Sequence, residues 1–336
     1  MTLPNTGQNS TRPKFLQLAD VVIEQIEKGK LKQDDRLPSV NEIIKNMKMS
    51  RETALKGLNY LSEQGIIRAV FRKGYYVQRT DVRLGLRIFF MLDKMTTFKD
   101  ELYHAFYDTL IEYGEIDVYF HHHNFRLFQQ LIENNLQNYT HFVIVTYLKG
   151  DVGAVLQKIP SDKLIILDAL EKSMGEEYAS VYQDFENDIY RSLKEAYELL
   201  QQYDCLTLVA PSTLFHLARA RKGFLRFCKE HHFKHQEVDG IDITNFHQNN
   251  VYITLAAYDI DEVKIIKLTH EKGWQLGREV GLISYNDTPV KEVLEGGITV
   301  ITTDFASMGK KAAEMIISGK KKKVANTTKL IIRKSL

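Results

Sequence analysis

Two small groups of residues near the N-terminus have the types and spacing that bind nucleic acid phosphates. Ser50, Arg51 and Thr53 lie in the first turn of a predicted helix, and Arg72 and Lys73 lie in a predicted tight turn. Hydroxyls and free backbone N–H groups at a helix start can hold phosphates, and an arginine there can reach a base edge or a phosphate. Each residue alone fits a solvated surface, but their joint placement indicates DNA binding.

The helices that must position these residues can be read from periodicity and capping. Apolar side chains recur at helical spacing over 15–26, and Gly29 follows where a helix would end. Ser39 is placed to cap a second helix, and Ser50 to cap a third that ends near Gly65. A turn of about three or four residues separates these two helices, which is the spacing of a helix-turn-helix.

A compact wing follows the helices. Residues 66–70 and 75–77 are predicted as short strands, with a cationic turn at 72–74 between them. In a winged helix-turn-helix, the N-terminus of the third helix enters a major groove. The cations of the wing would then contact the flanking backbone or the minor groove.

The charge of the chain is divided unevenly. The formal net charge is +2, but residues 1–80 carry +6 and the remainder carries −4. A basic segment beside a mildly acidic body is typical of a polyanion-binding domain joined to a second domain.

Length and composition bound the remaining possibilities. The 336 residues suffice for two or three folding units of about 150 residues. Two cysteines, Cys205 and Cys228, are too few for a disulfide scaffold, and the polar N-terminus lacks the apolar segment of a signal peptide. No apolar run approaches the roughly 18 residues of a membrane span. We therefore expect a soluble, cytoplasmic protein with no membrane partner.

Residues 13–78 resemble the DNA-binding domain of the GntR family of bacterial transcription regulators. The resemblance rests on the run LPSVNEIIKNMKMSRETALKGLNYLSEQGII and on the following RKGYYV. It implies a DNA-binding domain over 1–78, followed by a short linker over 79–84. Six contact residues are implied by the resemblance and three neighbouring cations complete the candidate set: Arg36, Ser39, Ser50, Arg51, Thr53 and Gly74, with Lys56, Arg72 and Lys73.

The rest of the chain, 85–336, alternates apolar strands with helices. Continuous apolar strands separated by helices predict parallel sheets covered on both faces, here as two doubly wound lobes. The first lobe is expected over about 85–184 and 303–320, and the second over about 185–302 and 321–336. The predicted strands are 86–92, 116–120, 141–147, 163–168, 205–209, 251–257, 279–285 and 298–301. The predicted helices are 98–113, 125–136, 185–203, 215–232, 261–272 and 306–317.

Polar and aromatic residues gather where these strands end. Ligands of such sheets bind beyond the carboxyl ends of the strands. Carboxylates, amides and an arginine there suit the hydroxyls of a sugar, and aromatic faces suit its C–H faces. The candidate effector-binding residues are Asp93, Phe98, Asp168, Arg219, Arg221, Tyr258, Asn286 and Asp287.

Residues 84–336 resemble the periplasmic-binding-protein-like effector domain of LacI-type repressors. The resemblance rests on ARARKGF at 218–224, GREVGLISYND at 277–287, and the segments 301–313 and 330–333. It implies that Asp168 contacts a sugar and that an arginine shortly before Gly223 does so, which leaves Arg219 and Arg221 as alternatives. Asn286 stands where that family usually has an aspartate.

Other chemistries are poorly supported. His121, His122 and His123 are consecutive, so they face alternate sides of a strand and cannot easily share one metal ion. Cys228 and His232 are spaced for one helix face, but no second cysteine pair supports a zinc site. Gly-x-Gly-x-x-Gly, Walker and Gly-x-Ser-x-Gly motifs are all lacking. We therefore predict no metal, no cofactor and no catalytic residues.

These features predict a DNA-binding transcription regulator that is not an enzyme. It would act as a homodimer on a palindromic operator, and a monosaccharide in the interlobe cleft would relieve repression. Two alternatives stay open. The effector could be a phosphorylated sugar or a nucleobase, for which Arg219 and Arg221 leave room. The body could instead be a pyridoxal-phosphate enzyme, although no Schiff-base lysine motif is evident and the body is short for that fold.

Overall fold

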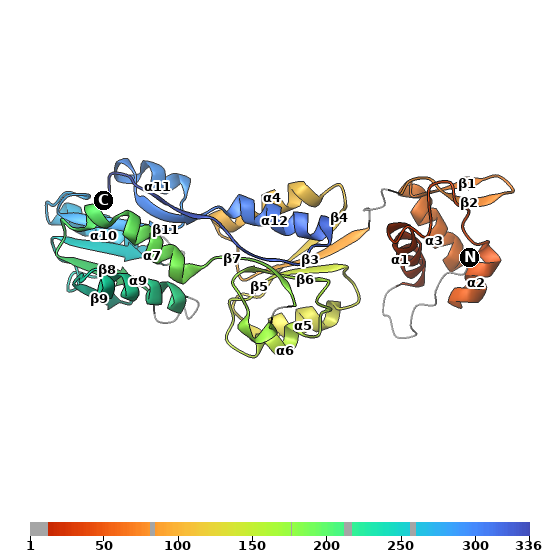
Figure 1. The fold of residues 1–336 in the computed structure, drawn as a ribbon, viewed down its shortest axis with the longest axis horizontal. Helices are drawn as coiled ribbons and strands as arrows, with labels where there is room; N and C mark the ends of the chain where they lie inside the picture. The colour runs from red at the N-terminus through yellow and green to blue at the C-terminus, as the bar shows by residue number, and fades with distance from the viewer. Residues whose placement is uncertain (1–12, 81–84, 176, 212–216, 256–259) are drawn as a thin grey trace.

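The computed structural model describes residues 13–80, 85–175, 177–211, 217–255 and 260–336. Figure 1 shows a small N-terminal domain followed by two sheet-containing lobes in a row. The predicted fold class, a winged helix-turn-helix joined to a two-lobed parallel α/β body, is confirmed. Parts of the predicted linker, of the strand 251–257 and of the helix 215–232 lie outside the described residues.

The N-terminal domain contains three helices and a two-stranded antiparallel wing. The elements are α1 (Lys14–Glu27), α2 (Val40–Met47), α3 (Arg51–Glu63), β1 (Ile67–Val70) and β2 (Gly74–Val77). Its own apolar core is built from one face of each helix and includes Leu18, Val22, Ile43, Leu58 and Leu61. Because this core is separate from those of the lobes, the domain buries its apolar side chains without help from the lobes.

The first lobe is a six-stranded parallel sheet in the order β13-β7-β6-β5-β3-β4. Its elements are β3 (Leu86–Leu92), α4 (Thr97–Leu110), β4 (Gly114–Phe120), α5 (Phe125–Asn135), β5 (His141–Val145), α6 (Val152–Leu156), β6 (Leu164–Asp168), β7 (Ala179–Tyr182), α12 (Phe305–Ser318) and β13 (Lys323–Ala325). Helices α4 and α12 cover one face, and α5 and α6 cover the other. The central strands are therefore buried on both sides, as their continuous apolar sequences predict.

The second lobe is a six-stranded sheet in the order β14-β12-β11-β10-β8-β9, with only β14 antiparallel to its neighbour. Its elements are α7 (Phe185–Glu195), α8 (Tyr197–Leu200), β8 (Cys205–Val209), α9 (Ala218–Glu230), β9 (His235–Val238), β10 (Asn250–Thr254), α10 (Ile260–Glu271), β11 (Val280–Tyr285), α11 (Pro289–Val293), β12 (Thr299–Thr303) and β14 (Thr328–Ile331). Helices α7 and α9 share one face of this sheet, and α10 packs on the other.

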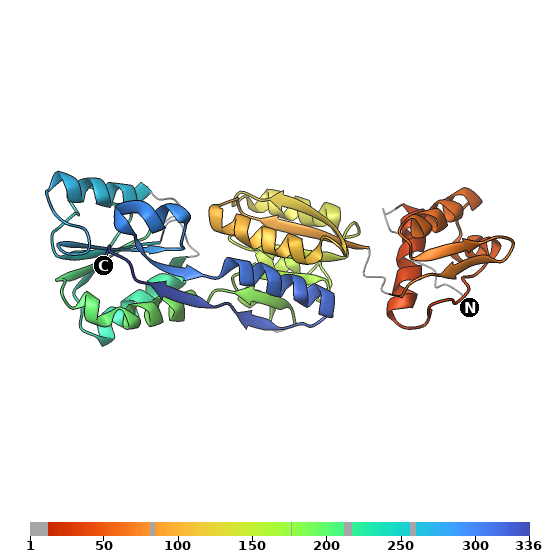
Figure 2. The ribbon, with the colours of Figure 1, turned by 90° about the horizontal axis from the view of Figure 1, so that it is seen from above.

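Three described segments connect the lobes, after β7, after β12 and between β13 and β14. Figure 2 shows α12 lying beside α4 before the chain returns to the second lobe. The helices approach so closely that a Cβ on Gly309 would lie 2.1 Å from the carbonyl oxygen of Leu102. Glycine at this position therefore permits the packing of the C-terminal helix on the first lobe.

Two details of the expected organisation are wrong. The segment 321–336 does not belong wholly to the second lobe, because β13 pairs with β7 and only β14 returns to the second sheet. A three-residue edge strand in a lysine-rich run carries too little periodicity to be recognised.

The single helix expected over 185–203 is interrupted at Ala196, where ψ is 1° and α7 gives way to α8. No glycine or proline marks that break.

Candidate functional site

The N-terminus of α3 is an exposed, capped helix start. The Ser50 hydroxyl accepts a hydrogen bond from the Thr53 backbone N–H at 3.1 Å, and the two hydroxyl oxygens lie 2.8 Å apart. Arg51 follows directly and is exposed. Lys56 lies in the second turn of α3. Its ammonium lies 4.5 Å from the centre of the Phe15 ring, so a residue of α1 helps to position this lysine. Exposed donors therefore stand at the positive end of the helix dipole, where anions bind.

Ser39 caps α2 in a complete capping box. Its hydroxyl accepts the Glu42 N–H at 3.3 Å, and the Glu42 carboxylate accepts the Ser39 N–H at 2.7 Å. Hydrogen bonding from the Ser39 side chain and backbone to this carboxylate lowers the pKa of Glu42. The side chain predicted to touch DNA thus also fixes the start of the helix that precedes the turn.

The wing brings the remaining cationic candidates together. Val70 pairs with Gly74, and the Lys73 N–H donates to the Val70 carbonyl at 3.0 Å. Arg72 adopts a φ of +58° at the tip. Gly74 has a φ of +107°, and a Cβ there would lie 3.5 Å from Nε of Arg36. Arg36 therefore lies beside the wing although it is far from it in sequence.

A cavity lies between the two lobes at the carboxyl ends of their strands. Its volume is about 60 Å³. Its lining comes from both lobes: Asp93, Lys94, Thr96, Phe98, Lys99, His123, Tyr147, Asp168, Gln183, Phe185, Leu217, Leu255, Tyr285 and Asn286. Four of the predicted effector residues, Asp93, Phe98, Asp168 and Asn286, are thus brought together. Four lining residues were not predicted from the sequence. Tyr147, Gln183 and Tyr285 lie at a strand end or within two residues of one, whereas Lys99 lies in the first turn of α4.

Asp93 and Lys99 form a buried ion pair in this cavity. The Lys99 ammonium contacts Oδ1 of Asp93, and both side chains are at least 96% buried. His123 Nε2 lies 3.5 Å from the second carboxylate oxygen. Burial alone would raise the pKa of Asp93, but the charge and hydrogen bond of Lys99, together with His123, outweigh it and hold that pKa below its ordinary value.

Asp168 is a buried carboxylate with neutral hydrogen-bond partners. Gln183 Nε2 donates to its Oδ1 at 2.5 Å, and the Tyr147 hydroxyl donates to its backbone carbonyl at 3.3 Å. Burial raises the pKa of Asp168, and the nearby Lys99 offsets this only in part. Its φ of +70° turns the chain sharply at the end of β6. This carboxylate can accept further hydrogen bonds from a ligand that carries hydroxyl donors.

Two polar atoms on second-lobe residues that line the cavity lack partners within the described residues. They are the Tyr285 hydroxyl and the Asn286 carbonyl oxygen Oδ1, both buried and both on residues that line the cavity. The buried Lys291 ammonium holds the backbone beneath them, donating to the carbonyl of Asn286 at 3.0 Å. Buried polar atoms without partners are costly, and polar groups of a ligand in the cavity could supply partners to both of these atoms.

The other predicted effector residues have different surroundings. Arg221 is ion-paired with Glu237, and it does not line the cavity as the structure describes it. Arg219 donates from the second lobe to the carbonyl of Leu170 in the first lobe at 3.4 Å. Asp287 is ion-paired with Arg333. Tyr258 lies outside the described residues.

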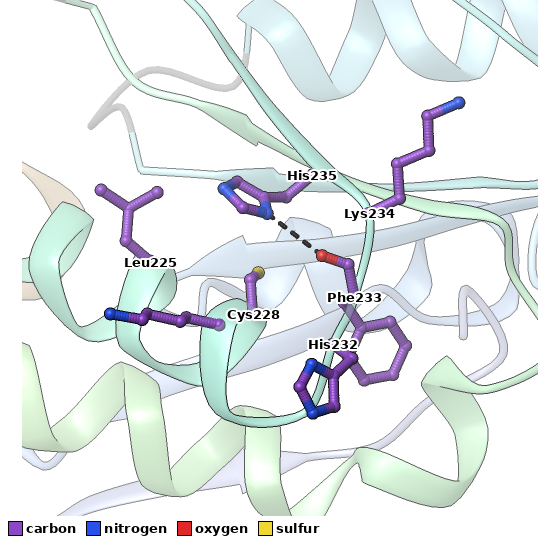
Figure 3. Close-up of a pocket in the computed structure, with 7 residues that line it drawn as sticks. Leu225, Cys228, His232, Phe233, Lys234 and His235 are labelled. Carbon is purple, nitrogen blue, oxygen red and sulfur yellow. Dashed lines mark hydrogen bonds between the residues drawn. The ribbon is translucent and has the colours of Figure 1, made fainter.

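The histidine and cysteine clusters have ordinary structural roles. His121 Nε2 lies 3.1 Å from the Val145 carbonyl, and burial lowers the pKa of this histidine to about 4. Figure 3 shows the surface pocket around Cys228, where His235 is hydrogen-bonded to the carbonyl of Phe233 at 3.1 Å. Burial raises the pKa of the Cys228 thiol to about 12. No group of three or more His, Cys, Asp or Glu residues that could hold a metal ion occurs among the residues described.

The fold and these two sites define a class of protein in which a winged helix-turn-helix domain is joined to a two-lobed ligand-binding body. Within the described helices, none is long and apolar enough to cross a membrane. Residues 15–77 match the bacterial regulatory proteins of the gntR family, and residues 206–336 match the periplasmic binding protein-like domain. The chain therefore combines a GntR-family domain with a periplasmic binding protein-like domain.

Three similar proteins are repressors by name. The mannosyl-D-glycerate transport/metabolism system repressor of Escherichia coli is 33% identical over 98 residues, covering 29% of this chain and 38% of that protein. The arabinose metabolism transcriptional repressor of Geobacillus stearothermophilus is 31% identical over 72 residues, covering 21% of this chain and 20% of that protein. The matches thus span well under half of either relative. The solved structure of the Escherichia coli trehalose repressor has a TM-score of 0.61 at 16% identity, covering 73% of this chain and 99% of that one, which shows a shared fold.

Proposed function

We propose that the protein is a transcription regulator whose binding to operator DNA is controlled by a small sugar. The observation that carries this proposal is the interlobe cavity, whose buried polar lining comes from both lobes of a chain that also bears a winged helix-turn-helix. A ligand held by both lobes favours one lobe arrangement over the other, which is the requirement for control at a distance. The protein acts by binding, not by catalysis, and it works in the cytoplasm.

The chemistry of the cavity supports a polyhydroxylated ligand. Asp168 and the Asn286 carbonyl oxygen accept hydrogen bonds from hydroxyls, while the rings of Phe98 and Phe185 offer apolar faces. The Lys99 ammonium is already paired with Asp93, so this buried cation of the cleft is not available to hold a phosphate. A neutral monosaccharide therefore fits this lining better than a phosphorylated sugar.

A hydrogen-bonded chain of side chains connects the cavity to the segments that join the lobes. Gln183 donates to Asp168 and accepts the Thr303 hydroxyl at 2.8 Å, and Thr303 and Thr328 share a hydrogen bond of 3.0 Å. Gln183 lies on the first connection, Thr303 is the last residue of β12, where the second connection begins, and Thr328 is the first residue of β14, where the third ends. A ligand that engages Asp168 therefore acts on every connection that a lobe rotation must bend. Because the cavity of about 60 Å³ is small, we infer that a sugar enters with the lobes apart.

Two copies of the chain would place two recognition helices on a palindromic operator. Arg51 is suited to the major groove and the wing cations to the flanking backbone, with Arg36, Ser39, Ser50, Thr53, Lys56 and Gly74 in supporting contacts. Exposed apolar side chains on two helices of the second lobe support a homodimer: Ile260 and Val263 on α10 are 61% and 41% exposed, and Val290 and Val293 on α11 are 59% and 75% exposed. Such surfaces commonly mark protein interfaces.

The experiment has two stages. The protein first selects duplexes from a randomised DNA pool. In parallel, a thermal-shift screen tests monosaccharides, sugar phosphates and nucleobases, because a tight ligand raises the unfolding temperature. Gel shifts with the selected duplexes then measure DNA affinity with each stabilising compound. A sugar that raises the unfolding temperature and releases DNA supports the proposal. Failure to select any duplex, or DNA affinity unchanged by every compound that binds, refutes it.

A further inference from the structure

The wing tip carries a large aromatic side chain that nothing in the described chain covers. Phe71 is 85% exposed, more than any other exposed large hydrophobic residue described. It occupies the first position of the three-residue connection between β1 and β2. Turn positions are usually filled by small or polar residues, so the turn itself does not require a phenylalanine here. The wing therefore presents an exposed apolar group at its tip.

The backbone around Phe71 is held firmly enough to aim this side chain. The Lys73 N–H closes the turn on the Val70 carbonyl at 3.0 Å, and the strands pair in register from Val70–Gly74 to Ile67–Val77. The base of the wing is tied to the segment before α2, where the Arg68 guanidinium meets Asp34 at 2.8 Å. A rigid hairpin of this kind can press a side chain into a groove without a large loss of conformational freedom.

The charges beside Phe71 indicate what the ring contacts. The Arg72 guanidinium lies 5.2 Å from the centre of the ring, and the exposed Lys73 follows it. An apolar ring flanked by two cations does not suit the surface of a second copy of this basic domain, because like charges would meet there. It suits DNA, where phosphates border a groove whose base pairs present flat apolar faces.

We propose that Phe71 is an apolar wedge that enters the minor groove beside each half-site and partly unstacks one base step, with Arg72 and Lys73 on the bordering phosphates. This rests on the proposed DNA-binding function and adds a source of specificity to it. Unstacking costs least at pyrimidine–purine steps such as TA and CA/TG. The protein therefore selects a flexible step at a position outside the bases that α3 reads.

The test uses full-length protein and duplexes selected by the wild-type chain, with 2-aminopurine placed at successive positions flanking each half-site. Wild-type binding raises 2-aminopurine fluorescence at one flanking step. Phe71→Ala abolishes that rise and weakens binding about ten- to a hundredfold, as expected when an exposed aromatic ring is no longer buried on binding. Phe71→Leu, which keeps an apolar wedge, retains part of both effects. Ile243→Ala, at an exposed apolar side chain of the second lobe, changes neither.

The outcomes separate the wedge from the function on which it rests. If Phe71→Ala binds the same duplexes with unchanged affinity and fluorescence, the wedge is wrong while DNA binding stands. A loss of affinity together with dissociation of the protein dimer in sedimentation would assign the ring to a second copy and also overturn the wedge. If the wild-type chain selects no duplex, both proposals fall. Arg72→Ala is expected to keep the fluorescence rise and to reduce the salt dependence of binding by about one phosphate contact.

Discussion

Arg333 and Asp287 form a two-pronged ion pair that ties the C-terminal segment to the turn after β11. The guanidinium donates from Nη1 to Oδ1 at 2.8 Å and from Nη2 to Oδ2 at 2.7 Å. Hydrogen bonding to Asp287 raises the pKa of Arg333 further above its ordinary value. The turn held in this way carries Asn286, whose side chain lines the cavity. Asp287, expected from the sequence to bind the effector, is instead paired with Arg333 beside a residue that lines the cavity.

We expect Asp287→Ala and Arg333→Ala each to lower the free energy of unfolding by about 1–3 kcal/mol, because each leaves a charged partner without its hydrogen bonds. Both side chains are mostly buried, so solvent does not replace these bonds fully. The double variant should cost much less than the sum of the two, since the pair is lost once. Urea unfolding of all four proteins measures this, and additive losses would show that the two residues act independently.

Asp168→Asn is expected to make the protein more stable at neutral pH while removing its response to the effector. Burial raises the pKa of Asp168, so the folded state binds its proton more tightly than the unfolded chain. Its contribution to stability therefore falls as pH rises from the unfolded pKa of about 4 through the raised value. The increase in the free energy of unfolding caused by Asp168→Asn should be present at pH 7 and should shrink toward pH 4. Urea unfolding at a series of pH values measures it. A variant that is less stable at pH 7, or that still releases DNA with the effector, would contradict this.

Thr303→Val should change the coupling between effector and DNA. The substitution keeps the side-chain volume but removes the hydroxyl that donates to Gln183 and contacts Thr328. The effector concentration that releases half of the bound DNA should shift by about 5- to 150-fold, the usual range of a coupling free energy. Thr303→Ser retains the hydroxyl and should behave as the wild type in the same gel-shift titration. Equal midpoints for Thr303→Val and wild type would remove this hydrogen-bonded chain from the mechanism.

Arg51→Ala should weaken binding to the selected duplexes by about 1–3 kcal/mol and relax preference at one base position, because Arg51 is exposed in the first turn of α3. Repeating the selection with the variant reads out the lost preference. Lys229→Ala, at an exposed cation on α9, provides a control of equal charge change. A loss that is the same for every sequence, with a smaller salt dependence, would place Arg51 on a phosphate instead.

Features that depend on local pattern could be predicted from the amino-acid sequence. Ser39 and Ser50 could be predicted as the N-caps of α2 and α3, because a cap bonds to a backbone N–H only three residues away. Both hydroxyls accept that hydrogen bond in the structure. Asp93 and Asp168 could be assigned to one cleft because parallel strands end at the same edge of a sheet. Two lobes followed from the alternation of apolar strands and helices, which needs no knowledge of distant contacts.

The tertiary structure alone decided which charges are free and which are already paired. Lys99 turns toward Asp93, Arg221 toward Glu237 and Arg333 toward Asp287. The edge strand β13 likewise joins the first sheet by pairing with β7. These outcomes depend on the direction of side chains and on strands brought together from distant parts of the chain. Neither the side-chain directions nor the strand pairing can be predicted from local spacing, because the partners become neighbours only when the lobes have folded.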